Sequence, residues 1–399
     1  MKQVGHTNEK LGKTAIVLGI YFLLLPTDCF RIGAIGSLLK AYALLPVACL
    51  FLSGGMRWLM LDKLLIQMFM LLAMASLSSL WSINFEETTA SVRSLFLNII
   101  LVALMAGTYR YTVKERAFLL RCLVASSWVT VICMLLFSER TAAGRLTLMM
   151  GDSTQDPNYV AGYILFAFSY HVTSYLQQKK LRHFFGAAVI FLVVILTGSR
   201  GALAAYFACI FFAVVFDIKA SRNPVGAAAF AVIFIVAGYF IFNIAMQTVD
   251  ESIASRFTLE YLLEHGTTGR SRIWLHLLDK FWNASIGRQL FGHGYGTTRL
   301  MNTLGGSIKG LVAHNLYIDN LISIGIAGLF IQLGLQLQCI KMAIRTRNRM
   351  LICSYGAFLV MSLSLSLTNY KPMWSAIMVI IILQKEPRSS NSVKVMREI

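Results

Sequence analysis

The sequence predicts an all-α polytopic membrane protein, and three observations support this prediction. Of the 399 residues, 57% are hydrophobic and only 14% are charged, a balance that is too apolar for an ordinary soluble domain. Apolar runs of roughly 17 to 25 residues, long enough to cross a bilayer as a helix, follow one another along the chain. Short clusters of basic residues separate many of these runs. We therefore expect a single integral membrane domain over residues 1–399.

About 12 transmembrane helices account for the apolar runs. We place them near residues 14–27, 33–52, 64–81, 93–109, 117–137, 158–177, 183–198, 201–216, 224–246, 314–338, 350–367 and 371–384. The first run ends without a small-residue cleavage pattern, so it predicts a retained span and not a signal peptide. The seven cysteines lie mostly inside apolar segments and form no CxxC pair, which argues against a disulfide framework or a zinc site.

The basic residues predict the orientation of the spans. If the N-terminus is cytoplasmic, alternate connections and the two chain ends together hold 22 of the 36 Lys and Arg residues. This asymmetry follows the positive-inside rule and predicts that both termini face the cytoplasm. The net charge of +18 could also suggest nucleic acid, but the basic residues form no continuous groove or known nucleic-acid module. We therefore expect no nucleic-acid partner.

This orientation leaves two substantial segments outside, residues 138–157 and a large loop at 247–313 between the ninth and tenth spans. Within the loop, an amphipathic helix is predicted near 269–283. Its apolar residues recur with the spacing of one helical face, at positions 273, 274, 277, 278, 281 and 282. Arg272, His276 and Asp279 lie on the opposite face. Such a helix would lie along the outer membrane interface or cap the span bundle.

Three arginines at the predicted outer boundary are candidate anion ligands. Arg200 lies between two glycines in Gly-Ser-Arg-Gly, which would let a large ligand approach the backbone. Arg270 and Arg272 begin the loop helix, where free N–H groups already favour anions, and two guanidiniums there could clamp a diphosphate. Arg272 is the stronger candidate, because it shares a polar face with His276. The alternative for these arginines is contact with lipid phosphate at the interface.

His314 opens an apolar helix directly after the long polar loop. An imidazole with an ordinary pKa near 6.5 suits proton transfer at neutral pH, although a lone His at a helix start is more often structural. Asn315 and Asp319 lie one turn apart, and Tyr317 lies on the His314 side, which would allow an oriented polar pocket. Gly325 and the following Gly328 predict close helix packing.

Two further segments have simple structural interpretations. Gly292-His-Gly-Tyr-Gly296 lacks the preceding strand of a dinucleotide site, so we expect a flexible external turn there. Asp156-Pro-Asn158 predicts a turn and a helix start. The carboxylate of Asp156 could still contact substrate hydroxyls from outside.

Taken together, these residues resemble the O-antigen ligase and O-antigen polymerase superfamily of bacterial membrane glycosyltransferases. The stretch from His314 to Gly328 fits the family pattern His-[Asn/Ser/Gln]-x9-Gly-x-x-[Gly/Thr/Tyr] without a gap. Also similar are Gly-Ser-Arg-Gly-Ala-Leu at 198–203, Arg-x-Arg-x-Trp at 270–274, and Leu-Phe-Gly-x-Gly-x-Gly at 290–296. The order of these motifs carries the resemblance over roughly residues 150–335.

The resemblance implies a cofactor-free, metal-independent inverting glycosyltransferase with a bundle like the C-type membrane glycosyltransferases. Its donor would be a glycan on undecaprenyl diphosphate, presented at the outer face of the bacterial inner membrane. By carry-over, Arg200 and Arg272 would bind the diphosphate, and His314 would position or deprotonate the acceptor hydroxyl. Other polar residues of these motifs are expected to bind substrate: Arg270, Asn315, Tyr317, Asp156, Asn158 and His276.

The acceptor distinguishes a polymerase, which uses a second lipid-linked repeat unit, from a ligase, which uses lipid A-core. The run Asp156-Pro-Asn-Tyr resembles polymerase-like members, and nothing identifies a lipid A-core site, so a polymerase is favoured and a ligase is the alternative. A chain-length regulator is a candidate partner. A flippase or transporter is the competing class, but such proteins often have repeated halves and midplane sites, whereas these halves are unlike and the motif residues gather at one face.

Overall fold

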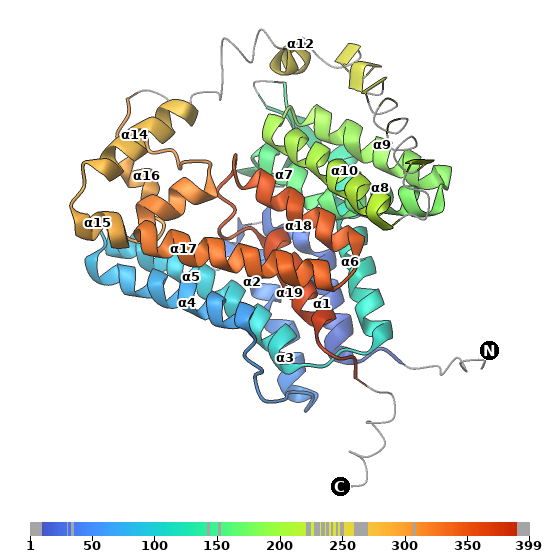
Figure 1. Cartoon of the computed structure of the whole chain (residues 1–399), viewed down its shortest axis with the longest axis horizontal. Coiled ribbons are helices and arrows are strands. Elements are labelled where there is room, and N and C mark those ends of the chain that lie inside the picture. The colour runs from blue at the N-terminus through green and yellow to red at the C-terminus, as the bar shows by residue number, and fades with distance from the viewer. Residues whose placement is uncertain are drawn as a thin grey trace.

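The computed structural model describes residues 10–29, 31–32, 36–141, 144–150, 153–220, 251–258, 270–305 and 309–388, with isolated residues at 225–226, 232, 236, 239–240, 242–244 and 246–247. Most of the described residues are helical (Figure 1). The helices of the first half are α1 (Lys13–Leu23), α2 (Leu38–Tyr42), α3 (Leu44–Leu52), α4 (Lys63–Leu77), α5 (Phe85–Val102), α6 (Val113–Leu136), α7 (Pro157–Tyr163), α8 (Leu165–Gln178), α9 (Leu181–Leu196) and α10 (Arg200–Ala220).

The helices of the second half are α12 (Glu251–Ala254), α14 (Arg270–Trp282), α15 (Ile286–Phe291), α16 (Thr298–Met301), α17 (Leu316–Arg345), α18 (Arg349–Met361) and α19 (Lys371–Gln384). Short 3-10 segments are η1 (Leu25–Cys29), η3 (Ser78–Trp81) and η5 (Ser255–Phe257), and η4 (Ala103–Thr108) is a π-helix that extends α5. Polar residues fix several starts. Asp62 caps α4, and Thr112 with Glu115 forms a capping box at α6.

The helices agree with a polytopic membrane protein. Among the described residues, five helical runs are long and apolar enough to cross a membrane: Lys63–Trp81, Phe85–Thr108, Val113–Leu136, Arg200–Ile218 and Leu316–Arg345. Shorter apolar helices are Lys13–Leu23, Leu38–Leu52, Leu181–Leu196, Arg349–Met361 and Lys371–Gln384. Together with α7 and α8, these helices overlap every predicted span except 224–246, which lies largely outside the described residues. The polytopic character is confirmed, and the number of spans stays a prediction.

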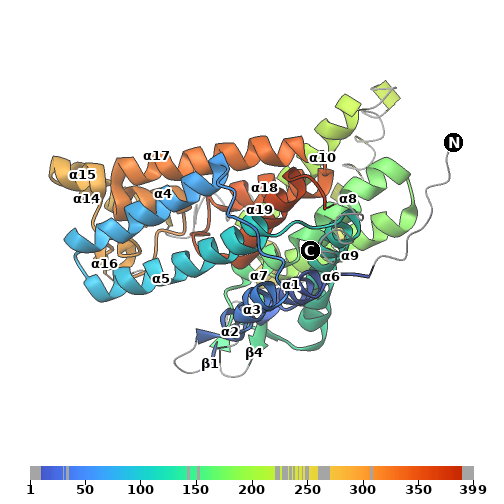
Figure 2. The same ribbon diagram turned by 90° about the horizontal axis from the view of Figure 1, so that it is seen from below.

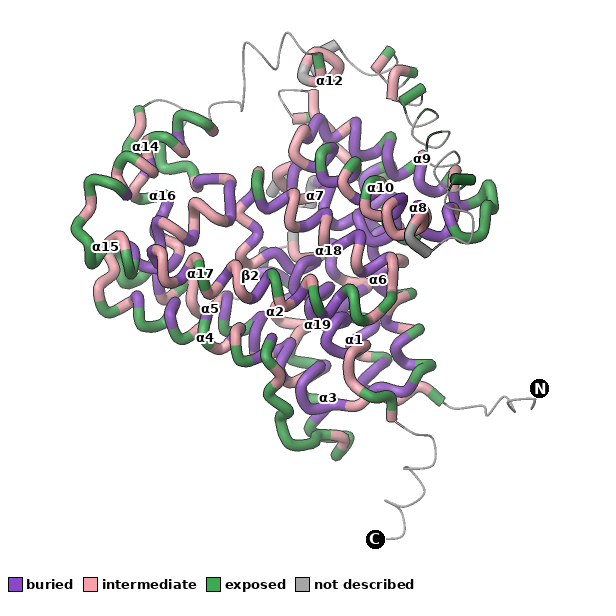
Figure 3. Tube along the Cα trace, viewed as in Figure 1, coloured by how far each residue is buried: buried purple, intermediate pink, exposed green. Residues whose placement is uncertain are grey.

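The interior of the bundle is built around α18 and α19. Every position of α19 from Lys371 to Ile382 is buried, as expected for a helix that is apolar on all sides. α10 packs along α18 and α8 lies against both, while α17 packs along α4 (Figures 1 and 2). Exposed positions follow the outer sides of α4 and α5 (Figure 3). They include Ile66, Met70 and Phe96, which suit contact with lipid.

The two ends of the described chain meet at one end of the bundle. The backbone N–H of Gly12 donates to Glu115 Oε1 at 2.9 Å, and Arg388 Nη2 lies 3.6 Å from the same oxygen. The backbone N–H of Arg388 also donates to Tyr111 O at 3.1 Å. These contacts hold the first and last described segments against the start of α6. The compartment that the termini face stays a prediction.

α17 consists of two helical arms that meet at Gly325. Gly325 has φ of 67° and ψ of −169°, which interrupts the helix. In a straight helix Tyr317 and Gln336 would be about 28 Å apart, yet their side chains interact. The first arm (residues 316–324) therefore folds back beside the second arm (residues 326–345). Gly325 is needed at the reversal, because a Cβ there would lie 2.4 Å from the backbone of Leu290.

Small antiparallel sheets lie between the helices. β1 (Arg31–Ile32) pairs with β2 (Gly36–Ser37). In the segment 138–157, β3 (Ser138–Arg140) pairs with β4 (Leu146–Met150), and β4 pairs with β5 (Ser153–Thr154), where Glu139 lies opposite Thr147. The expectation of an all-α chain is therefore corrected by these short strands, which the apolar periodicity does not reveal. The strands lead directly into α7 and its cap at Asp156.

Candidate functional site

His314 lies immediately before the first arm of α17 in a left-handed backbone conformation, with φ of 49°. This conformation costs roughly 1–2 kcal/mol for a residue with a Cβ, so surrounding contacts must hold it. Asn315 Oδ1 caps the arm by accepting from the backbone N–H of Tyr317 at 2.9 Å. On the other side, Trp274 Nε1 of α14 donates to Ala313 O at 2.6 Å. The backbone at His314 is therefore held through the residues on both sides of it.

The turn at residues 362–364, directly after α18, brings the predicted site residues together. Asn315 Nδ2 donates to Leu363 O at 3.1 Å, and Arg270 Nη1 donates to Ser364 O at 2.9 Å. Gly201 packs so closely on Ser364 that a Cβ would lie 2.0 Å from the hydroxyl. Arg200, at the first position of α10, adjoins this contact. Sequence reasoning missed the 362–364 turn, because its functional contacts are made mainly by backbone carbonyls.

Arg145 is a second residue that the sequence interpretation missed. Its Nε donates to Thr197 O at 2.8 Å, and its Nη2 donates to Asn158 Oδ1 at 3.0 Å. Asn158 also donates from Nδ2 to Asp156 Oδ1 at 2.6 Å, and that oxygen accepts the backbone N–H of Asn158 at 2.8 Å. Asp156 and Asn158 thus form the helix start that the sequence predicts. Arg145 ties this start to the turn that precedes Arg200, although no motif marks it in the sequence.

Burial and two charges set the protonation of His314. Desolvation lowers the pKa of the imidazole below its usual value, the positive charge of Arg270 lowers this pKa further, and the Asp156 carboxylate raises it. The ring is therefore neutral at neutral pH. Its Nδ1 is buried and has no hydrogen-bond partner among the described residues. A neutral imidazole with an uncommitted nitrogen can accept a proton from a hydroxyl group.

The structure gives the remaining candidates different surroundings. Arg272 is exposed on α14, whereas the neighbouring Arg270 reaches the 362–364 turn and acts on His314. The sequence favours Arg272 over Arg270 as the anion ligand. In the structure, however, it is Arg270 that contacts the 362–364 turn and acts on His314. His276 Nε2 lies 3.2 Å from Thr303 Oγ1, so its described partner is in the loop and not at His314. Tyr317 turns toward the second arm of α17, where it interacts with Gln336.

The predicted amphipathic helix caps the bundle. Ile273, Leu277 and Phe281 of α14 are buried together with Ala313 and Ile322. Of the two predicted arrangements, the structure thus shows a helix packed on the end of the bundle, although Leu275 and Trp282 are exposed. The apolar face of α14 holds the segment that carries His314.

The glycine-rich segment 292–296 differs from the expected flexible turn. His293 and Tyr295 are 7% and 3% exposed, and a Cβ at Gly292 would lie 2.3 Å from Ser323 O. A Cβ at Gly294 would lie 2.2 Å from Ser82 Oγ, and the glycine has φ of 113°. The turn is therefore packed between the start of α5 and the first arm of α17. The prediction of flexibility is wrong, because the glycines permit close approach and not mobility.

A polar cavity of about 160 Å³ adjoins the site along the first arm of α17. Its walls include carboxyl, amide and hydroxyl groups from several elements: Tyr295, Asp319, Asn320, Ser323, Ser366 and Asn369. Val312, two residues before His314, also lines the cavity. Asn320 Nδ2 and Tyr295 Oη are buried without a hydrogen-bond partner in the described part of the chain. Buried polar groups of this kind suit a ligand rich in hydroxyl groups.

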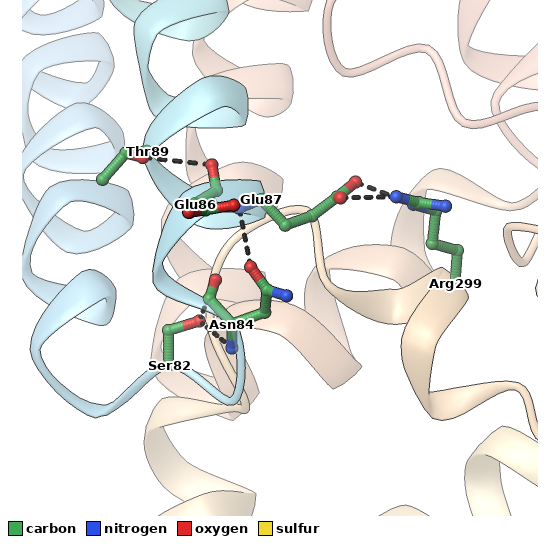
Figure 4. A network of polar contacts seen from close by, with 6 residues as sticks. All are labelled: Ser82, Asn84, Glu86, Glu87, Thr89 and Arg299. Carbon is green, nitrogen blue, oxygen red and sulfur yellow. Dashed lines mark hydrogen bonds and ion pairs between the residues drawn. The ribbon is translucent and has the colours of Figure 1, made fainter.

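An ion pair connects two elements next to this polar cavity. Arg299 Nε and Nη2 bind Glu87 Oε1 and Oε2 at 2.8 and 2.5 Å, which links α16 to the start of α5 (Figure 4). Asn84 Oδ1 caps α5 by accepting from the backbone N–H of Glu87 at 2.9 Å. Both partners of the ion pair are partly exposed, so the pair contributes about 0–1 kcal/mol to stability. Its two parallel hydrogen bonds fix geometry more than they add stability.

Within the described residues, no three His, Cys, Asp or Glu side chains gather as a metal site. Arg270 supplies a positive charge that acts on His314, and Arg200 stands at the adjoining start of α10. This combination of fixed guanidiniums and a neutral imidazole can hold an anionic leaving group and activate a hydroxyl beside it.

Residues 185–333 match the model of a protein family described as O-antigen ligase. The matched region includes Arg200, Arg270, His314 and Gly325, together with the capping helix α14. A comparison with curated proteins finds no significant match. In general terms, the family match supports a glycosyltransferase-like membrane enzyme that acts on lipid-linked glycans. The family match over residues 185–333, in a chain of polytopic helical architecture, supports the resemblance to the O-antigen ligase and O-antigen polymerase superfamily.

Proposed function

We propose that the protein polymerises oligosaccharide repeat units carried on undecaprenyl diphosphate. The single observation that carries this proposal is the meeting of Arg270, Asn315 and the start of α10 at Arg200–Gly201 on residues 362–364, beside His314. A diphosphate leaving group needs fixed cations, and a hydroxyl nucleophile needs a base. We propose that the arginines and His314 provide both within one site at the end of an apolar helical bundle. The reaction is proposed at the outer face of the bacterial inner membrane.

In the proposed reaction, the diphosphate binds between Arg200 and Arg270. The fork of Arg270 donates to Ser364 O through one nitrogen, so its orientation is set before substrate arrives. As the bond between the anomeric carbon and the diphosphate oxygen breaks, its electron pair stays on that oxygen. The guanidiniums stabilise this growing charge more in the transition state than in the donor. Arg272, which is exposed on α14, is proposed to assist in attracting the diphosphate to the site.

His314 is the proposed base. The acceptor oxygen attacks the anomeric carbon from the face opposite the diphosphate, and its proton passes to the neutral imidazole. The new glycosidic bond therefore has inverted configuration, and no covalent bond to the enzyme forms. The lowered pKa of His314 supports this role, because the ring is ready to accept a proton at neutral pH. The conjugate acid then releases the proton to water.

The polar cavity beside Ala313 is proposed to hold a sugar next to the reacting carbon. Asn320 is 1% exposed and Tyr295 is 3% exposed, and each has a polar atom that lacks a partner among the described residues. Hydroxyl groups of a sugar would satisfy both atoms, together with the Asp319 carboxyl. A cavity of about 160 Å³ suits one sugar ring better than a whole repeat unit. The rest of the glycan would extend into the aqueous vestibule.

The identity of the acceptor distinguishes the proposed polymerase from the alternative, a ligase. The run Asp156-Pro-Asn-Tyr159 supports a polymerase, in which the attacking hydroxyl belongs to a second lipid-linked glycan. Transfer onto lipid A-core is the second candidate, and the description of the matched family as O-antigen ligase favours it. The diphosphate site and the base would serve both reactions, so the two candidates differ only in what approaches His314.

Reconstitution of the purified chain in proteoliposomes tests the proposal. Undecaprenyl-diphosphate repeat units are supplied with and without lipid A-core, and products are resolved by size. Longer lipid-linked glycan without core supports the polymerase, and product attached to core supports the ligase. Movement of donor across the bilayer without a new glycosidic bond would exclude both. Arg182→Gln is a matched control, because this exposed arginine belongs to the start of α9 and not to the site.

A further inference from the structure

The end of the bundle opposite His314 contains a cavity of about 550 Å³. α18 joins the two regions, because it begins after Arg345 and ends at the 362–364 turn. Its 13 residues span about 20 Å. Charged residues from four parts of the chain line the cavity: Lys63, Arg110, Arg345 and Lys385, with Asp62 and Glu386 as the acids. Four cations against two carboxylates make the cavity favourable for an anion.

The acids offset only part of this charge. Asp62 Oδ1 accepts the backbone N–H groups of Leu64 and Leu65 at 3.0 and 2.9 Å, so its carboxylate is engaged as the cap of α4. Glu386 is exposed, where water screens it. The Lys385 ammonium donates to Gly107 O at 2.9 Å and is held at the cavity wall. Burial lowers the pKa of Lys385 to about 8, which still leaves the group mostly protonated at neutral pH.

An exposed apolar segment lies beside these cations. Residues 56–61 read Met-Arg-Trp-Leu-Met-Leu, and Trp58 is 95% exposed while Leu61 is 58% exposed. The segment is fixed by its backbone, since Arg57 N donates to Thr108 O at 3.0 Å. Gly107 also lies so close that a Cβ would meet Leu59 at 2.4 Å. An ordered Trp among exposed apolar side chains is typical of the headgroup region of a bilayer.

We propose that this cavity binds the phosphate headgroup of an anionic phospholipid, with residues 56–61 inserted among the neighbouring acyl chains. Basic pockets between transmembrane helices are suited to such headgroups, and the apolar segment supplies the contact that a soluble phosphate would lack. Arg110 and Lys385 are the principal ligands, because each is partly buried at the wall of the cavity. The inference is independent of glycan transfer, since the site lies at the other end of α18.

Titration of the purified full chain with phosphatidylglycerol tests the site. We expect phosphatidylglycerol to raise the thermal unfolding midpoint, and phosphatidylcholine and inorganic phosphate to leave it nearly unchanged. Arg110→Gln combined with Lys385→Gln should weaken phosphatidylglycerol binding about thirtyfold, because each basic residue near an anionic lipid contributes roughly a fivefold factor. The matched control, Lys180→Gln with Arg182→Gln, removes two exposed charges outside the cavity and should bind like the parent.

Two results would overturn the proposal. One is equal binding by the cavity variant and the control, and the other is an equal shift with inorganic phosphate, which would indicate a soluble ligand. If the cavity variant does not fold, the parent chain still gives an answer through Trp58. The emission of Trp58 is the difference in fluorescence between the parent and Trp58→Phe. Brominated phosphatidylglycerol should quench this emission more strongly than brominated phosphatidylcholine does. Equal quenching by both lipids would contradict the site.

Discussion

Replacing Arg270 by Gln should lower the rate of glycan transfer far more than the same change at Arg272. Arg270 Nη1 is oriented by Ser364 O at 2.9 Å, and its charge reaches His314, whereas Arg272 is exposed. Loss of one preoriented donor to a developing anion costs about 2.7–4 kcal/mol, or roughly 100- to 1000-fold in rate. Loss of an exposed charge costs about 0.2–1 kcal/mol, or up to about fivefold.

The assay is the initial rate of product formation in proteoliposomes, with both variants at equal membrane content. A second readout separates charge from structure. The positive charge of Arg270 lowers the pKa of His314, so its removal should raise that pKa and move the acid limb of the pH–rate profile to higher pH. Arg272→Gln should leave the limb in place. If Arg272→Gln loses more activity than Arg270→Gln, the choice of Arg270 as diphosphate ligand is refuted.

Three other changes have defined outcomes. Asp156→Asn keeps a helix-capping side chain but removes the carboxylate that raises the pKa of His314, so the acid limb should move to lower pH; an unmoved limb would show that Asp156 does not act on the base. Asn320→Ala should raise KM for the glycan roughly 5- to 150-fold with a smaller effect on kcat, since polar contacts worth about 1–3 kcal/mol are lost. An unchanged KM in steady-state kinetics would contradict the proposal that a sugar binds in the cavity. Gly325→Ala should lower stability by more than about 1 kcal/mol, because its φ of 67° and the nearby backbone leave no room for a Cβ, whereas Gly287→Ala faces open space. Equal thermal unfolding midpoints for the two glycine variants would contradict this.

The predicted spans followed directly from the apolar runs, because a helix in lipid must satisfy its own backbone and be apolar over its length. The reversal inside α17 could not be predicted in this way. Residues 316–345 form one apolar run, and the turn depends on the backbone of Leu290, which is distant in sequence. With the structure known, the nine-residue spacing between Asn315 and Gly325 is the length of the first arm. The spacing in the motif thus reflects the length of the helix between the cap at Asn315 and the reversal at Gly325.

The site was predicted in part. His314, Arg200 and the start of α14 are marked in the sequence by charge, glycine and helical periodicity. The order of Arg270 and Arg272 was not predictable, because both lie in the same first turn and only the contact with Ser364 distinguishes them. Arg145 could not be identified either, since its role consists of hydrogen bonds to Thr197 and to a side chain in another element.

The rate of glycan transfer by His314→Asn tests the central proposal most directly. Asn tolerates the left-handed conformation of this position, so the variant should insert and fold like the parent. With undecaprenyl-diphosphate repeat units in proteoliposomes, loss of the base should lower the rate about 100- to 10,000-fold while donor binding is retained. A rate close to that of the parent, with donor bound equally well, would contradict the assignment of His314 as the base.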